Sequence, residues 1–298
     1  MRPFPILAAT LVLAAAPALR AEPPVLIEVG PSDWEEPTMS VTQALEADPP
    51  SFAAKSPLNI TNEGPTKSSF ILGAANTAGK FNSYFTTDLF IVNPHPLGTA
   101  KVNLYALRAN TDNVSNAPPA KGLTIPAFGW VVVKDVLSQL GVTGGAAVLV
   151  SVDAAQSTGT STTVHSFAYT STPGPAGGRY GVNIHGVGVW FSDTLYDGWA
   201  VGAAVNAQSR TNVGVLNYST DAPLTTYVDV TSPSAGKVKT LTLNVPRLSF
   251  TQVSLGDSVS ALEDGLLRFH DGTTKYVGYM VVNDNLTNDA NFQLAASW

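Results

Sequence analysis

The chain contains no cysteine among its 298 residues. Disulfides, thiolate nucleophiles and cysteine metal ligands are therefore excluded, and the folded state must be stabilised by its hydrophobic cores. Charge is also scarce, because only 13% of the residues are Asp, Glu, Lys or Arg and the net charge is −6. The chain thus lacks the basic surface that binds nucleic acid, and we expect no nucleic-acid partner.

Apolar runs of the roughly 20 residues that span a membrane are absent too. Residues 6–16 form a shorter apolar run, which follows Arg2 and precedes small residues, as in a secretory signal peptide. We expect residues 1–21 to be removed on export, with no transmembrane span remaining. Export without cysteine predicts a bacterial protein that is secreted, extracellular or at the cell surface, with the periplasm as a further location.

Residues 22–67 are rich in proline and acidic side chains, and Lys55 is their first basic residue. Such a composition buries too little apolar surface to offset the entropy lost on ordering. We therefore predict a disordered acidic linker over 22–67.

The remaining chain repeats itself with a period of about 120 residues. The stretch 86–94 (Thr-Thr-Asp-Leu-Phe-Ile-Val-Asn-Pro) returns as 210–218 (Arg-Thr-Asn-Val-Gly-Val-Leu-Asn-Tyr). Four pairs of residues mark the repeat: Asp88 with Asn212, Asn93 with Asn217, Pro126 with Pro246, and Tyr169 with Tyr279. Because an Asp in one copy becomes an Asn in the other, we expect their shared role to be hydrogen bonding to nearby backbone.

Each copy consists of short apolar or alternating segments separated by Gly, Pro and Asn, the pattern of strands and turns. A period of this length is a whole domain and not a solenoid repeat. We predict an all-β protein with two similar antiparallel β-sandwich (Ig-like) domains over 68–188 and 189–298.

The paired stretches 86–94 and 210–217, together with 282–289 (Val-Asn-Asp-Asn-Leu-Thr-Asn-Asp), resemble an uncharacterised two-domain β-sandwich region of secreted bacterial proteins. The resemblance covers roughly residues 70–292. It implies export and a paired sandwich, and it implies no activity and no catalytic residues.

Aromatic residues gather where the two predicted domains meet: Trp190, Phe191, Tyr196 and Trp199. Such side chains stack on sugar rings when exposed and pack against each other when buried. They are the candidate binding residues, and the alternative is that they hold the domains together.

Oxygen-bearing side chains crowd one stretch near the C-terminus: Asn283, Asp284, Asn285 and Asp289. They form a weak calcium candidate, because Leu286 stands where an EF-hand would place a ligand, and the alternative is a turn rich in Asn and Asp. The four histidines show no metal-ligand spacing, so no other metal and no cofactor is expected.

No catalytic motif is present: Gly-x-Ser-x-Gly and Ser-x-x-Lys in a convincing context are missing. We therefore predict a non-catalytic structural and binding module, with an extracellular polysaccharide or surface protein as partner. A secreted hydrolase of extracellular polymers is the first alternative. An outer-membrane β-barrel is the second, because residues 292–298 alternate in part and end on an aromatic residue.

Overall fold

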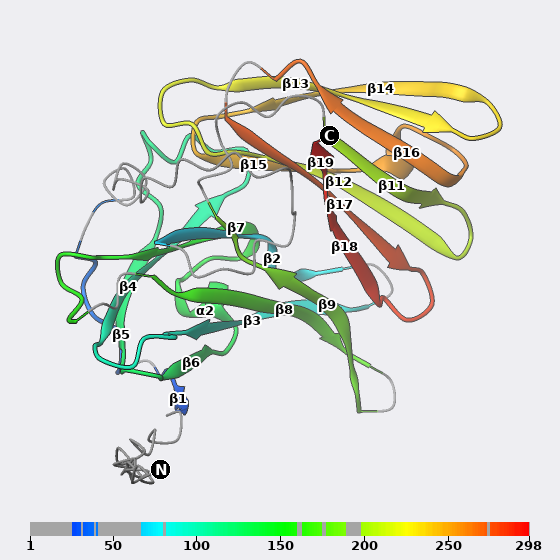
Figure 1. Cartoon of the computed structure of the whole chain (residues 1–298). Helices are drawn as coiled ribbons and strands as arrows, with labels where there is room; N and C mark the ends of the chain where they lie inside the picture. Colours follow the sequence, from blue (N-terminus) through cyan, green and yellow to red (C-terminus); the bar gives the residue numbers. More distant parts are fainter. Residues whose placement is uncertain are drawn as a thin grey trace, which may run out of the picture.

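The computed structural model describes residues 26–40 and 67–297, except for 31, 39, 80–81, 160–162, 175–176, 189–197 and 273–274. Over these residues the chain is almost entirely β-strand, which confirms the all-β prediction. We call residues 26–40 and 67–188 the first half and 198–297 the second half; their sheets lie in stacked layers, with the second half at the top of Figure 1. No helix in the described part of the chain is long and apolar enough to cross a membrane.

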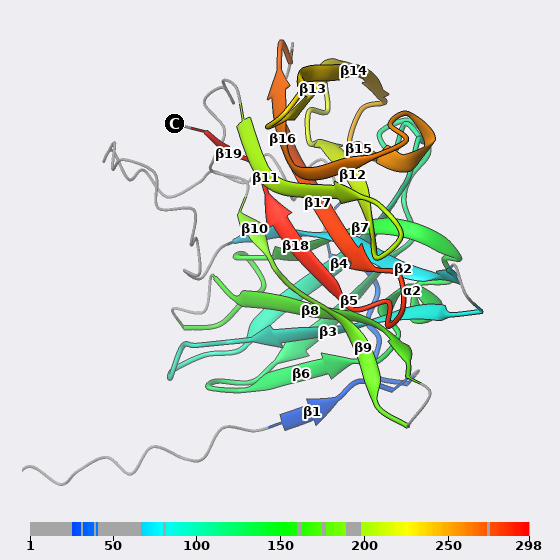
Figure 2. The same cartoon turned by 90° about the vertical axis from the view of Figure 1, so that its right-hand side faces the viewer.

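The first half forms one ten-stranded sheet that curls over on itself (Figures 1 and 2). In order of pairing, one arm contains β10, β2, β7, β4 and β5, and the other contains β1, β6, β3, β8 and β9. The strands are β1 Leu26–Glu28, β2 Ser68–Ala78, β3 Tyr84–Val92, β4 Ala100–Arg108, β5 Ala120–Ile125, β6 Trp130–Val133, β7 Gly144–Val152, β8 His165–Pro173, β9 Arg179–His185 and β10 Val187–Gly188.

Strand β2 joins the two arms. Most of it pairs with β7, and its last residues, Thr77 and Ala78, pair with β3. The register of the β2–β7 pair shifts between Ile71 and Ala74, where Gly73 has a φ of 75°. Glycine adopts this left-handed conformation without strain, so the strand can bend there and carry the sheet around the enclosed core.

The second half forms two separate antiparallel sheets. The five-stranded sheet has the order β14-β13-β16-β11-β19, and the four-stranded sheet has the order β15-β12-β17-β18. The strands are β11 Gly198–Val205, β12 Ser209–Asn217, β13 Leu224–Ser232, β14 Gly236–Val245, β15 Ser249–Ser254, β16 Leu262–His270, β17 Tyr276–Asp284, β18 Ala290–Leu294 and β19 Ala296–Ser297. Short helices, α2 (Val136–Gln139) and η1 (Leu255–Asp257), follow β6 and β15.

The prediction of two similar Ig-like sandwiches is wrong, because only the second half consists of two separate sheets facing each other. In the first half the 11-residue strand β2 reaches across to β3 and merges both arms into one sheet. Its counterpart β11 has eight residues and, among the described strands, pairs with β16 and β19 but not with β12. The difference depends on a few pairings at a strand end, which the periodicity of the sequence does not encode.

Two asparagines close matching strands in the two halves. The Nδ2 atom of Asn93 donates to the carbonyls of Gly98, Ile125 and Pro126 at 2.9–3.3 Å. Asn217 Nδ2 does the same with three carbonyls over the same range of distances, those of Ala222, Val245 and Pro246. Both side chains are fully buried, so the donors of each amide are satisfied within the protein by these carbonyls. This explains why Asn and Pro recur at these positions.

Part of the segment for which we predict a disordered linker makes ordered contacts, within its described residues 26–30, 32–38 and 40. Strand β1 pairs in parallel with β6, and Ile27 and Trp34 pack against the core of the first half. Glu35 forms an ion pair with Lys101 and accepts a hydrogen bond from Thr124 at 2.6 Å. A few apolar side chains thus anchor an otherwise acidic segment. Residues 41–66 and the predicted signal peptide lie outside the described residues.

Candidate functional site

The two halves meet through the outer face of the four-stranded sheet of the second half. Along β12, β15 and β17 this face is apolar at one end, where Leu216, Phe250 and Tyr279 are buried. They pack in one cluster with Phe70, Leu149 and other residues of β2, β4 and β7 in the first half. The shared hydrophobic cluster therefore fixes the two halves to each other.

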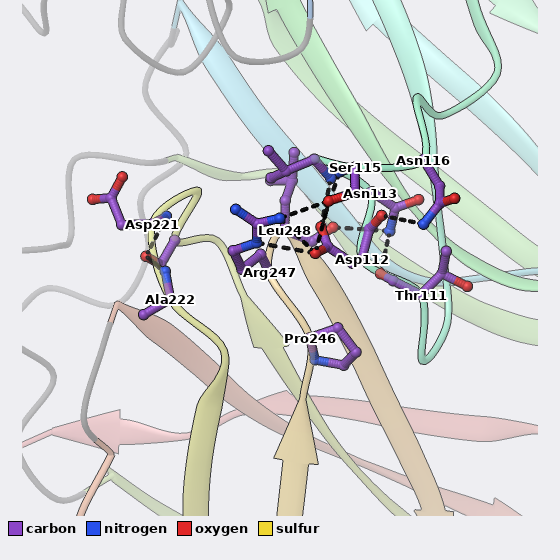
Figure 3. Close-up of polar contacts among 12 residues, drawn as sticks. Thr111, Asp112, Asn113, Ser115, Asn116, Asp221, Ala222, Pro246, Arg247 and Leu248 are labelled. Atoms are coloured by element: carbon purple, nitrogen blue, oxygen red, sulfur yellow. Dashed lines mark hydrogen bonds and ion pairs between the residues drawn. The ribbon is translucent and has the colours of Figure 1, made fainter.

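A polar clamp borders this cluster (Figure 3). Nε and Nη2 of Arg247 donate to Asp112 Oδ2 at 3.0 and 2.7 Å, and Nη2 also donates to the Ser115 hydroxyl. Asn113 is fully buried, and its Nδ2 donates to Leu248 O at 2.9 Å and to two carbonyls of its own loop. Burial alone would raise the pKa of Asp112, but Arg247 and Ser115 outweigh it and lower that pKa below its usual value.

Backbone groups extend the clamp. Asn110 N donates to Phe250 O at 2.9 Å, and Thr111 N donates to the Ser249 hydroxyl at 3.2 Å. The Thr251 hydroxyl donates to Asn110 Oδ1 at 2.7 Å. Since these bonds satisfy the polar groups that the junction buries, we interpret the clamp as structural.

A cleft of about 270 Å³ opens beside the shared cluster, at the polar end of the same sheet face. One wall belongs to the first half and is made largely of small or apolar residues, among them Gly73, Gly181 and Ile184, with Phe85 at its side. Glycine leaves backbone accessible to anything bound there. The opposite wall is the second-half sheet.

That second wall carries polar side chains in neighbouring register positions. Asn212 on β12 lies opposite Ser254 on β15, and both line the cleft. Within the described residues, neither side chain makes a hydrogen bond, so their donors and acceptors face the cleft solvent. Gln252 also lines the cleft, and its Oε1 accepts the hydroxyl of the buried Tyr279 at 3.0 Å.

Arg210 is the cationic residue of the cleft. Its Nη1 donates to Asn285 Oδ1 at 2.9 Å and its Nη2 donates to Asn288 Oδ1 at 2.7 Å. Burial lowers the pKa of the Arg210 guanidinium, and the charge of Asp284 opposes that shift. A guanidinium remains protonated at neutral pH even so, and it gives the cleft a positive charge.

The lining residues determine what chemistry the cleft can perform. Among its described lining residues there is no Asp, Glu, His or Cys. Amides and hydroxyls both donate and accept hydrogen bonds, but at neutral pH they do not act as general acids or bases without an activating partner. The arrangement therefore suits binding of a polar ligand.

The aromatic binding candidates are only in part within the described residues. Trp199 lies on β11, half-buried on the outer face of the five-stranded sheet, with the Arg268 guanidinium 5.4 Å from its ring centre. It does not line the cleft. Trp190, Phe191 and Tyr196 lie outside the described residues.

The calcium candidate residues are engaged in other contacts. Asp284 Oδ1 accepts the backbone N–H groups of Leu286 and Thr287, and Asn285 Oδ1 accepts Arg210. Asp289 Oδ1 accepts the N–H of Gly181 in the first half, and Asn283 lines the cleft. The guanidinium therefore lies beside the oxygens where a cation would bind. In the described part of the chain, no group of three His, Cys, Asp or Glu side chains could hold a metal.

The repeat markers Asp88 and Asn212 have different surroundings. Asp88 is buried, accepts the backbone N–H of Asp135, and pairs with Lys134 at 3.2 Å and Arg179 at 2.9 Å. Burial alone would raise its pKa, but these partners lower it. The expected backbone hydrogen bond thus exists for Asp88, whereas Asn212 faces the cleft.

The tyrosine markers also differ in position. Tyr169 lies opposite Asp88, whereas Tyr279 lies opposite Gly214, two residues from Asn212. The two tyrosines therefore do not hold equivalent register positions. The alignment of the two repeats by sequence places these tyrosines two residues out of register, because both strands are similarly apolar and fit at either position.

Sequence reasoning missed the cleft residues Gln252 and Ser254. Their signal is the alternation along β15, where the buried Phe250 is followed by polar side chains at every second position. That alternation is common on solvent-facing strands, so it does not reveal a cleft until the facing wall is known.

No protein-family model matches the chain, and no curated protein matches it. Solved structures that are similar include red sea bream transglutaminase, at 12% identity over 77% of this chain and 31% of that chain, with a TM-score of 0.16. A Ruminococcus gnavus β-glucuronidase is similar at 8% identity over 76% of this chain and 33% of that chain, with a TM-score of 0.15. The matched part thus spans about a third of each of those chains. TM-scores this low support no argument, so no family is assigned and only the all-β content agrees with the expected resemblance.

Proposed function

We propose that this protein is an exported, non-catalytic structural and binding module of a bacterial cell surface or extracellular space. Its cleft binds a short hydroxyl-rich segment of an extracellular polysaccharide. The observation that carries the proposal is the polar wall of Asn212, Gln252 and Ser254, which faces a cleft whose described lining includes no acidic or histidine side chain.

The chemistry of the lining favours a saccharide. Sugar hydroxyls both donate and accept, which matches the amides of Asn212 and Gln252 and the hydroxyl of Ser254. The apolar faces of a sugar ring fit the opposite wall, where Ile184 and Phe85 lie. A volume of about 270 Å³ is near the lower limit for small-molecule sites, so it suits a short segment of polymer.

The alternative, a hydrolase of extracellular polymers, requires a carboxylate pair or a nucleophile with its base beside the bound polymer. The described lining residues supply neither, which favours binding. Incubation with the bound polysaccharide distinguishes the two: new reducing ends would replace the binding proposal with hydrolysis.

The test is isothermal titration of the mature chain with soluble bacterial and plant polysaccharides. The double variant Asn212→Ala with Ser254→Ala should bind at least about tenfold more weakly, because two hydrogen bonds of about 1 kcal/mol each are lost. Neither side chain bonds elsewhere in the described chain, so folding should be unaffected. Asn291→Ala, at an exposed site outside the cleft, is the matched control. Equal affinity of the double variant and the wild type would contradict the proposal.

A further inference from the structure

One sheet face of the first half is open and rich in aromatic side chains. On strands β6, β3 and β8, six alternate residues that point away from the core are only partly buried, whereas Asp88 and Val132 on the same face are buried. The six are Phe90, Val92, Trp130, His165, Phe167 and Tyr169. Phe167 contacts the His185 ring edge-on at 5.2 Å, and the Arg179 guanidinium lies 5.7 Å from the Tyr169 ring. Such a surface is unusual for a solvated sheet.

The second half contains an equivalent sheet face, formed by β12, β15 and β17. Asn93 and Asn217 make the same set of hydrogen bonds, so they align β3 with β12. Val92 pairs with Trp130 as Leu216 pairs with Phe250. Phe167 lies opposite Phe90, and Tyr279 lies opposite Gly214. Because Phe90 and Gly214 hold equivalent positions in the two strands, Phe167 and Tyr279 are equivalent too.

In the second half these matched residues, Leu216, Phe250 and Tyr279, are buried. Their cover is the sheet face of the first half that contains Phe70, Leu72 and Leu149, in the shared cluster described above. The molecule therefore already contains one interface in which a four-stranded face docks onto the face formed around β2 and β7.

A second copy of that covering face is also open. In the second half, Trp199 and Val201 on β11 follow the pattern of Phe70 and Leu72 on β2, each pair preceding a glycine of positive φ. Val201 is 58% exposed and lies opposite Leu266 on β16. The face is more polar than its first-half counterpart, because Arg268 lies opposite Trp199.

We propose that copies of this chain associate head to tail, the open face around Phe167 docking onto the open face around Val201 of a second copy. The two faces belong to the outermost sheets, at opposite ends of the stack in Figure 1. Different surfaces therefore meet, and such a heterologous contact adds copies without closing a dimer. The association is separate from saccharide binding, because neither face includes the residues of the cleft's polar wall.

The test is sedimentation velocity of the mature full chain between about 1 µM and 1 mM, the range in which modest interfaces dissociate. The weight-average sedimentation coefficient should rise with concentration beyond that of a dimer. Monomer at every concentration, or growth that stops at a dimer, would overturn the proposal.

Variants that place a glutamate on one face at a time test which two faces meet. Phe167→Glu and Val201→Glu should each remain monomeric, yet an equimolar mixture should form a 1:1 complex, because each variant keeps one intact face. Tyr169→Glu provides a second variant of the first face if Phe167→Glu fails to fold. Leu286→Glu, at an 84% exposed site away from both faces, should associate like the wild type. A mixture that forms no complex, or variants that still associate alone, would contradict head-to-tail docking.

Discussion

The buried asparagines show how single side chains determine the ends of strands. The sequence predicts Asn93 and Asn217 as markers of the repeat, at equivalent positions of the two similar stretches. That each amide also bonds more distant carbonyls could not be predicted, because two of its three acceptors come from a segment about 30 residues away. Short-range patterns predict that a turn occurs, whereas its stabilising contacts are long-range.

We expect Asn217→Ala to lower the free energy of unfolding by about 2–3 kcal/mol, because three carbonyls lose this donor and one of the three hydrogen bonds is buried. Equilibrium urea denaturation measures the change. Asn291→Ala, at an exposed site, should change it by less than about 0.5 kcal/mol. Equal effects of the two substitutions would refute the assigned role of the buried amide.

A second single residue, Asp229, should make the stability of the fold depend on pH. Burial alone would raise the pKa of Asp229, but Thr240, Lys237 and His270 outweigh it and hold the pKa at about 2. A carboxyl with a lowered pKa stabilises the folded state above its unfolded pKa of about 4 and loses that contribution as the pH falls toward 2.

Asp229→Asn should therefore lower stability by about 1–2 kcal/mol at pH 6, a range reduced for partial solvent screening. The difference from the wild type should shrink toward pH 2. Urea midpoints at several pH values measure it, and a difference independent of pH would contradict the ion-pair account.

At the scale of elements, the strands follow from sequence alternation, but their assembly does not. The all-β class and most strands were predictable, because apolar residues recur at every second position with Gly, Pro or Asn between segments. The curl of the first half depends on Thr77 and Ala78 pairing with β3. The cleft depends on which wall faces Asn212. The curl and the cleft both depend on contacts between segments far apart in the sequence, so no local sequence pattern predicts them.

Gly214 tests the packing of β12 against β17. A Cβ at this position would lie 2.1 Å from Cζ of Tyr279, so Gly214→Ala must displace a buried ring at the junction of the halves. We expect a loss of about 1–3 kcal/mol in the free energy of unfolding. Gly178→Ala, where a Cβ meets nothing within 4 Å, is the control and should be close to neutral. A neutral Gly214→Ala would show that the ring does not pack as described.

At the scale of the whole molecule, the shared cluster and the polar clamp join the halves. Because Phe70 and Tyr218 belong to one cluster across the junction, we expect the halves to unfold together. Differential scanning calorimetry should give a single transition whose calorimetric and van't Hoff enthalpies agree. Two resolved transitions in the wild type would contradict a rigid junction.

The central claim is that the cleft between the halves binds a saccharide, and methyl NMR tests it most directly. Ala75, Val182, Ile184 and Val281 line the cleft, whereas Val201 lies on the far sheet face and serves as the internal reference. On titration with a polysaccharide that binds, the four cleft methyl signals should shift together and saturate while Val201 stays unchanged. Shifts confined to Val201 and the signals of its neighbours on the outer face would place the ligand there and contradict the claim.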